Sequence, residues 1–218
     1  MSRTIAGNIA ADLSPAAYRR ASRFLSGLDE DWARHIARIG PCLHAAKPAR
    51  EPYEALVRAI AYQQLHAKAG DAILARLLAL YPESSFPSPE QLLASNPEQQ
   101  RACGFSAAKL ATIRGIAHAT VEGVVPDLEE ARRLPDPELI ERLTSLRGVG
   151  RWTVEMFLIY SLERSDILPV GDFGVREGYG RLKGLAKAPT PSQMREIGAA
   201  WTPYRTAAAW YLWRLPSR

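Results

Sequence analysis

The feature that most constrains the fold is a short apolar turn with two glycines, LRGVG, at residues 146–150. A helical run ends before it, near Thr144, and an apolar helical run follows it over residues 151–163. Two glycines placed two positions apart allow a tight turn that no side chain crowds. Gly148 and Gly150 would then present main-chain N–H groups just ahead of a helix N-terminus, where unpaired donors and the positive dipole end favour a phosphate. The segment predicts two helices joined by a hairpin that clamps a phosphate backbone.

A carboxylate follows the second of these helices, at the end of a loop that contains Pro and Gly. The loop ERSDILPVGD ends at Asp172, and the next helix is predicted to begin near Phe173. Asp is a favoured N-cap residue because its side chain accepts a main-chain N–H of the first helical turn. The positive end of the helix dipole keeps such a carboxylate ionised. Asp172 is therefore the candidate catalytic residue.

The composition predicts a globular protein that suits a polyanionic partner without requiring one. A chain of 218 residues, 47% hydrophobic and 23% charged, can bury a core as one large domain or two small ones. Its net charge is +5. Cys42 and Cys103 lack a CxxC spacing and support neither a disulfide framework nor a zinc site. No apolar run reaches the roughly 18 residues of a membrane span, and no signal peptide is evident. We expect a cytoplasmic protein without a membrane partner.

The rest of the chain indicates short helices separated by Pro and Gly. Apolar residues recur at helical spacing from Tyr53 onward, and no alternating strand pattern exceeds about four residues. Ser14 and Pro15 predict a helix start, with Ser14 as the N-cap. Residues 47–52, with two X-Pro pairs, predict a linker, and Trp32 is expected in the core. The predicted fold class is all-α.

Three of these features together resemble a known family: the hairpin at 148–150, Trp152 close behind it, and LPVGDFGVR with Asp172 twenty positions after Trp152. They are similar to the helix-hairpin-helix DNA glycosylase superfamily, and within it to the 3-methyladenine DNA glycosylase II branch of alkylation repair. The resemblance covers residues 52–215. The best-known members of this branch add an N-terminal mixed α/β domain. Only 52 residues precede Tyr53, so we expect that domain to be lacking.

The resemblance implies an all-α fold of two helical subdomains, with the active-site cleft between them. Residues 1–52 with 165–218 would form one subdomain, and residues 53–164, including the hairpin 146–150, the other. It also implies a monofunctional DNA glycosylase of base excision repair, which flips a damaged base out of duplex DNA and hydrolyses the N-glycosidic bond. The expected substrates are cationic alkylated bases such as 3-methyladenine and 7-methylguanine. The expected partner is damaged double-stranded DNA of the nucleoid, bound by a monomer.

Asp172 would supply the chemistry in this scheme. An ionised carboxylate beside C1′ stabilises the positive charge of an oxocarbenium-like transition state. A base alkylated at N3 or N7 is already cationic and leaves as a neutral molecule, so a second acid is not needed. Aromatic faces attract such a cation by about 0.5–2 kcal/mol. The residues expected to line the base pocket are Trp152, Phe173, Tyr204 and Met156, of which Tyr204 fits the core equally well.

Two segments are expected to contact DNA. At the hairpin these contacts would come from Gly148, Gly150 and Thr153. At a predicted helix junction, the segment EPYEALVRAIAYQQLHAKA resembles the part of the family that wedges into the gap left by the extruded nucleotide, here with Gln64 and Leu65. A solvated helix corner has the same pattern. Relatives often hold a monovalent cation, Na⁺ or K⁺, on hairpin carbonyls, which would here be those of Thr144, Leu146 and Val149.

Several positions depart from relatives. Met156 replaces a pocket aromatic and Gly171 stands where a second acid precedes the catalytic Asp, so the pocket is expected to be roomier. His66 replaces a small hydroxyl residue. Bifunctional relatives carry a Schiff-base Lys where this chain has Trp152, so no AP-lyase activity is expected. With two cysteines, the chain has no four-cysteine iron–sulfur loop, and no cofactor is expected.

Two other functional interpretations remain open from the sequence. Hairpins with a GxG pattern also occur in DNA-binding modules without turnover, in which Asp172 would be only a helix cap. The other interpretation is a glycosylase for a neutral lesion such as uracil or hypoxanthine. Such lesions usually require hydrogen-bonding side chains in the pocket, whereas mainly aromatic residues surround this motif.

Overall fold

All regular secondary structure in the part of the chain that the structure describes is helical. The computed structural model describes residues 15–44 and 50–215. These residues contain thirteen α-helices, one 3₁₀-helix and no β-strand, which confirms the predicted all-α class. None of the helices found in these ranges is long and apolar enough to cross a bilayer. The predicted N-cap Ser14 and the linker dipeptide Lys47-Pro48 lie outside the described residues.

The chain divides into two compact units. The first unit contains Met1–Lys47 and Leu158–Arg218, and the second contains Pro48–Phe157. The second boundary falls inside helix α10 (Arg151–Tyr160), so this helix carries the chain from the second unit into the first. The sequence places the same boundary at residues 164 and 165, after the apolar run rather than within it.

The first unit packs five α-helices and a 3₁₀-helix around an aromatic core. The Trp32 indole is 1% exposed and meets Trp201 edge-on, with ring centroids 5.4 Å apart. Trp32 is therefore a core residue, as predicted. The helices are α1 (Pro15–Ser26), α2 (Glu30–Ile39), α11 (Phe173–Leu182), α12 (Pro191–Gly198), η1 (Ala199–Trp201) and α13 (Arg205–Leu212).

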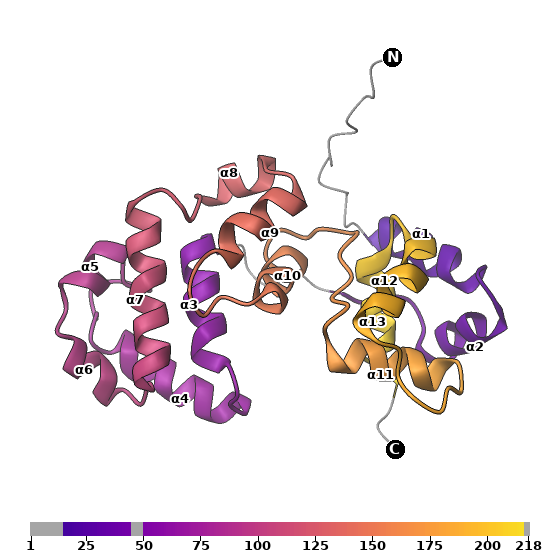
Figure 1. Ribbon diagram of the computed structural model, residues 1–218, viewed down its shortest axis with the longest axis horizontal. Helices are drawn as coiled ribbons and strands as arrows, with labels where there is room; N and C mark the ends of the chain where they lie inside the picture. The colour runs from indigo at the N-terminus through magenta and orange to yellow at the C-terminus, as the bar shows by residue number, and fades with distance from the viewer. Residues whose placement is uncertain (1–14, 45–49, 216–218) are drawn as a thin grey trace, which may run out of the picture. The chain divides into compact units, whose positions relative to one another are not determined.

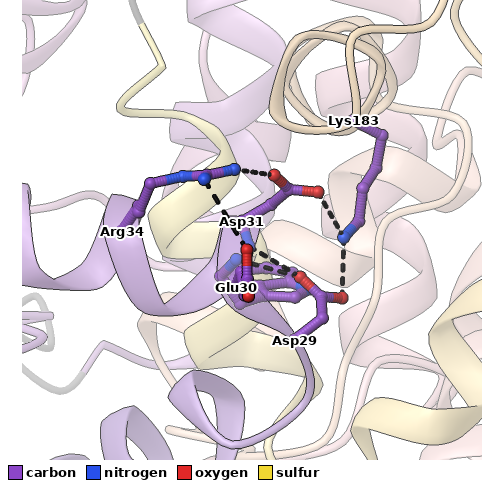
Figure 2. A network of polar contacts seen from close by, with 6 residues as sticks. Asp29, Glu30, Asp31, Arg34 and Lys183 are labelled. Atoms are coloured by element: carbon purple, nitrogen blue, oxygen red, sulfur yellow. Dashed lines mark hydrogen bonds and ion pairs between the residues drawn. The ribbon is translucent and has the colours of Figure 1, made fainter.

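A charged cluster ties α2 to the end of α11 (Figure 2). Asp29, the N-cap of α2, and Asp31 both bind the Lys183 ammonium, at 2.6 and 3.0 Å. Lys183 is the C-cap of α11, and its side chain is 19% exposed. Although burial alone would lower it, these two carboxylates raise the pKa of Lys183. The C-terminal end of α11 is thereby fastened, which matters because Asp172 precedes the opposite end.

The second unit is a layered bundle in which α7 packs against both α3 and α5 (Figure 1). Its largest fully buried hydrophobic side chains are aliphatic, for example Leu56, Ile60, Ile113 and Leu139. The helices that precede α10 are α3 (Pro52–Tyr62), α4 (Ala67–Leu78), α5 (Pro89–Ala94), α6 (Pro97–Ala102), α7 (Ala107–Val121), α8 (Leu128–Arg133) and α9 (Asp136–Thr144).

Side chains that accept a main-chain N–H cap the N-terminal ends of most of these α-helices. Ser106 accepts the Lys109 N–H at the start of α7, and α3 begins at Pro52. The end of α10 differs from the prediction, because the helix stops at Tyr160 rather than continuing to Glu163. Glu163 adopts a left-handed φ of 56°, and the chain turns there.

Candidate functional site

The predicted hairpin joins α9 to α10 in the second unit. Within it the Val149 N–H donates to the Leu146 carbonyl at 3.0 Å. Gly148 has φ +84°, and a Cβ on it would lie 2.2 Å from Oγ1 of Thr112 on α7. Gly150 has no such constraint: a Cβ there would meet nothing within 4 Å. Both glycines are exposed, but only Gly148 is required by the turn itself.

Helix α10 presents two of the predicted pocket residues on one face. Trp152 is 47% exposed and Met156 is half-buried, and residues four apart are neighbours on a helix surface. The side chain of Thr153, a residue predicted to contact DNA, is buried at 3% exposure. Its Oγ1 lies 3.4 Å from Nε2 of Gln63, which donates to it. The Thr153 side chain therefore links α10 to the end of α3.

The corner between α3 and α4 carries the two predicted wedge residues. Gln64 is exposed and has a left-handed φ of 57°, and Leu65 is 38% exposed. His66 follows as the N-cap of α4, where its Nδ1 accepts the Ala69 N–H at 3.3 Å. The His66 ring nitrogen thus accepts a main-chain N–H, as a Ser or Thr hydroxyl does at a typical N-cap.

Lys109, in the first turn of α7, approaches the same corner. Its Nζ donates to the Ala61 carbonyl at 3.0 Å and to the Gln63 carbonyl at 2.6 Å. Burial lowers the pKa of Lys109. The side chain of Lys109 is thus bound to main-chain oxygens of the corner.

Asp172 is the N-cap of α11 in the first unit, as predicted. Its Oδ1 accepts the Val175 N–H at 2.8 Å and the indole N–H of Trp213 at 2.9 Å. Two donors on one oxygen fix the orientation of the carboxylate. Phe173, the next residue, is 68% exposed.

Trp213 is a site residue that the sequence did not single out. A Cβ on Gly174 would lie 3.0 Å from its ring, and a Cβ on Gly178 would lie 2.3 Å from the Leu212 carbonyl. These two glycines, four apart on α11, thus let α13 approach closely enough to bring Trp213 to Asp172. The ring of Trp213 stacks on Tyr160, with centroids 6.5 Å apart and planes 19° apart. The Gly-x-x-x-Gly spacing was the sequence signal for this close packing.

The loop before Asp172 is held by the first turn of α13. The Arg205 guanidinium binds both oxygens of Asp166, at 2.8 and 2.9 Å. Thr206 Oγ1 donates to the Arg164 carbonyl at 2.6 Å and accepts the Ile167 N–H at 3.1 Å. The loop that leads to the carboxylate therefore has a defined path, set by a helix more than thirty residues further on.

Tyr204, the last predicted pocket residue, precedes α13. It is half-buried, and its ring lies 5.2 Å from that of Phe24 on α1. The residue thus packs at the edge of the aromatic core and keeps part of its surface exposed. This position is compatible both with a pocket residue and with a core residue, the two roles that the sequence left open.

Metal ligation by side chains has no support in the described ranges. No group of three or more His, Cys, Asp or Glu residues there is arranged to hold a metal ion. The carbonyls proposed to hold a monovalent cation are those of Thr144, Leu146 and Val149. They lie at and after the C-terminal end of α9, where the helix dipole is negative. Leu146 uses its carbonyl for the Val149 N–H, yet a carbonyl oxygen has two lone pairs.

Comparison with known proteins gives the family. Residues 57–203 match the model of the HhH-GPD superfamily base excision DNA repair proteins. The chain belongs to this superfamily. The match includes the hairpin, the corner between α3 and α4, and Asp172, whereas Trp213 lies beyond its end.

Individual members of the superfamily resemble the chain over most of its length. DNA-3-methyladenine glycosylase 1 of Schizosaccharomyces pombe is 47% identical over 196 residues, which are 89% of this chain and 86% of that protein. The solved structure of an S. pombe 3-methyladenine DNA glycosylase in complex with abasic DNA superposes with a TM-score of 0.81, covering 89% of this chain and 95% of that one. The solved structure of a DNA-3-methyladenine glycosidase of Bacillus halodurans is 33% identical in sequence. It superposes with a TM-score of 0.79 and covers 89% of this chain and 88% of that one.

Proposed function

We propose that this protein is a monofunctional DNA glycosylase that removes cationic alkylated bases from duplex DNA in base excision repair. It acts as a monomer on the DNA inside the cell. Similarity to proteins named for 3-methyladenine supports the substrate class. The observation that carries the proposal is the Asp172 carboxylate, which is held at the N-terminus of α11 by two N–H donors.

The proposed reaction needs one negative group beside the sugar. When the N-glycosidic bond breaks, the deoxyribose develops positive charge, and a carboxylate fixed nearby stabilises it without having to reorient. Val175 and Trp213 hold the Asp172 carboxylate in place before the substrate arrives. An alkylated purine carries its own positive charge and leaves as a neutral base. Water then adds to C1′ and loses a proton, which leaves a hydroxyl group on that carbon.

Base recognition would come from aromatic faces rather than hydrogen bonds. Among the proposed pocket residues, Trp152 is 47% exposed to solvent and Phe173 is 68% exposed. Stacking of a cationic base on such rings is worth about 0.5–2 kcal/mol. Met156 adds a polarisable but flexible surface, which suits a broad range of alkylated purines. Trp152 stands where bifunctional relatives have their lysine, so the product is an intact abasic strand.

Gly148, Gly150 and the Gln64–Leu65 corner are the proposed DNA contacts. The exposed glycines allow the main chain to approach a phosphate, and the corner presents two exposed side chains to the gap in the base stack. We also propose Na⁺ or K⁺ on the carbonyls of Thr144, Leu146 and Val149, which would add positive charge next to the phosphate. No other cofactor is proposed.

The experiment is base release from methylated duplex DNA by wild type and Asp172→Asn. Asparagine keeps an oxygen to accept the Val175 and Trp213 N–H groups, so the local structure is expected to persist. Loss of the negative charge should slow release of 3-methyladenine and 7-methylguanine by about 100-fold or more, with duplex affinity retained. Free bases are quantified by chromatography, and strand integrity is checked before alkali treatment.

Glu30→Gln is the matched control, because it removes one negative charge from a side chain that is 93% exposed. It should release bases at the wild-type rate. Undiminished release by Asp172→Asn would remove Asp172 from the proposed role. Absence of release by wild type from methylated DNA would favour a binding protein without turnover, and release from uracil or hypoxanthine duplexes alone would favour a neutral lesion.

A further inference from the structure

The corner between α3 and α4 has an unusual main-chain problem. Gln64 is a non-glycine residue in the left-handed region, with φ 57°, and such residues cost free energy unless their surroundings hold them. The corner also leaves carbonyls at the C-terminal end of α3 without helical partners. The Gln63 N–H donates to the Ile60 carbonyl at 3.3 Å, and the Leu65 N–H donates to the Tyr62 carbonyl at 3.1 Å. The carbonyls of Ala61 and Gln63 need another donor.

Lys109 supplies that donor from a different helix. Its ammonium caps α3 by bonding the Ala61 and Gln63 carbonyls at 3.0 and 2.6 Å. The cation thus lies at the negative end of the α3 dipole, where it is favoured. The main chain of Lys109 itself lies in the first turn of α7. A cation is disfavoured at that end of a helix. The bonds to α3 therefore account for a lysine at this position.

The corner is held from a second side by its own side chain. Gln63 Nε2 donates to the buried Oγ1 of Thr153 on α10, at 3.4 Å. Main-chain atoms of residues 61–63 are thus tied to α7, and the Gln63 side chain is tied to the helix that follows the hairpin. The exposed side chains of Gln64 and Leu65 project from a corner with a fixed base.

We propose that Lys109 is a positioning residue for strand opening: it holds the α3–α4 corner in the shape in which Gln64 and Leu65 enter the base stack. The lysine itself does not meet the substrate. This inference rests on the proposed function, because it assigns a role within base flipping. It predicts that Lys109 matters only where a paired base must be opened.

The test compares Lys109→Met with Lys109→Arg and Lys68→Met. Methionine keeps the length and apolar stem but removes the donors, whereas arginine keeps both charge and donors. Lys68 is an exposed lysine of α4, so its replacement controls for the loss of one positive charge from the same unit. Two duplex substrates are used: 7-methylguanine paired with cytosine, and 7-methylguanine opposite a tetrahydrofuran abasic analogue, which removes the pairing.

Lys109→Met should excise the paired lesion about ten-fold more slowly in single turnover, the effect expected when a charged hydrogen bond is lost. Excision opposite tetrahydrofuran should change less than about two-fold. Lys109→Arg should recover most of the rate on the paired lesion, and Lys68→Met should match wild type on both. Equal loss on both substrates, or no loss on either, would overturn the proposal.

A second measurement does not depend on activity. Hydrogen exchange of the amides of residues 63–66 in the free protein should accelerate in Lys109→Met relative to wild type and Lys68→Met, because the corner loses its anchor. Unchanged exchange at these amides would overturn the proposal even if the protein releases no base. Accelerated exchange in a protein without base release would uphold the anchoring and reject the proposed function instead.

Discussion

At the scale of single residues, the pair of Asp172 and Trp213 defines the candidate catalytic carboxylate. Asp172 could be found from the sequence, because a helix cap next to a Pro/Gly loop is a local pattern. Its second donor lies 41 residues further along the chain and depends on the path of α13. The orientation of the Asp172 carboxylate therefore depends on two segments of the chain. The LPVGDFGVR motif contains the first, and the second, with Trp213, lies outside it.

Trp213→Phe should lower the single-turnover rate of base release by about ten-fold, because one of the two donors that orient the carboxylate is lost. Phenylalanine keeps an aromatic ring beside Tyr160, so stacking and stability should be little affected. The affinity for undamaged duplex, measured by fluorescence anisotropy, should stay at the wild-type value.

The double variant with Asp172→Asn shows whether Trp213 acts through the carboxylate. If it does, Trp213→Phe adds no further loss to Asp172→Asn, because effects of coupled residues are not additive. Multiplied losses in the double variant would instead assign Trp213 an independent contact with the base or the sugar.

At the scale of elements, the two hairpin glycines have different tasks. Gly148 is required by its left-handed φ and by Thr112 on α7, whereas a side chain on Gly150 would meet nothing in the protein. The sequence treats them as equivalent, since both follow the same pattern. Packing against α7 shows that Gly148 is needed to form the turn, whereas Gly150 leaves space for a ligand.

Gly150→Ala should leave thermal stability near that of wild type and weaken binding to any duplex, damaged or undamaged, because a phosphate carries no information about the base. Gly148→Ala should lower the free energy of unfolding by about 1–3 kcal/mol. Calorimetry and duplex binding, measured on both variants, separate the two effects. A stable Gly150→Ala variant with wild-type affinity for both duplexes would contradict the clamp.

At the scale of the whole molecule, two buried histidines of the first unit are expected to make stability depend on pH. His35 is 4% exposed and donates from Nε2 to the Tyr211 carbonyl at 2.9 Å, while its Nδ1 faces the Arg38 guanidinium at 3.3 Å. His44 is 7% exposed and lies 3.3 Å from the Ile159 carbonyl. Burial lowers the pKa of both imidazoles in the folded protein.

The free energy of unfolding should therefore fall as the pH falls below about 6.5, the ordinary pKa of histidine. The unfolded chain binds protons there while the folded histidines stay neutral, so acid favours unfolding until the lowered folded pKa values are reached. Above about pH 6.5 the contribution is fully present. Urea unfolding at a series of pH values from 7.5 to 5 would measure this slope.

A double variant, His35→Gln with His44→Gln, is the control for that measurement. Glutamine retains a donor but does not titrate, so the variant should lose part of the acid slope even if it is less stable at neutral pH. An unchanged slope in the variant would assign the acid sensitivity to other groups.

The sequence alone determined the all-helical class, the hairpin and the candidate Asp172 at a helix N-cap. These features depend on residues a few positions apart, and the preferences of Gly, Pro and capping side chains act over that distance. It also marked the exposed corner at Gln64 and Leu65 through its resemblance to a family.

Only the tertiary structure decided which residues support that site. Trp213 reaches Asp172 because glycines on α11 admit α13, and Lys109 reaches the end of α3 because α7 packs beside it. Thr153 on α10 reaches Gln63 at the end of α3. Each contact joins segments that are distant along the chain, so its energy depends on how helices pack and not on any preference that the residue carries alone.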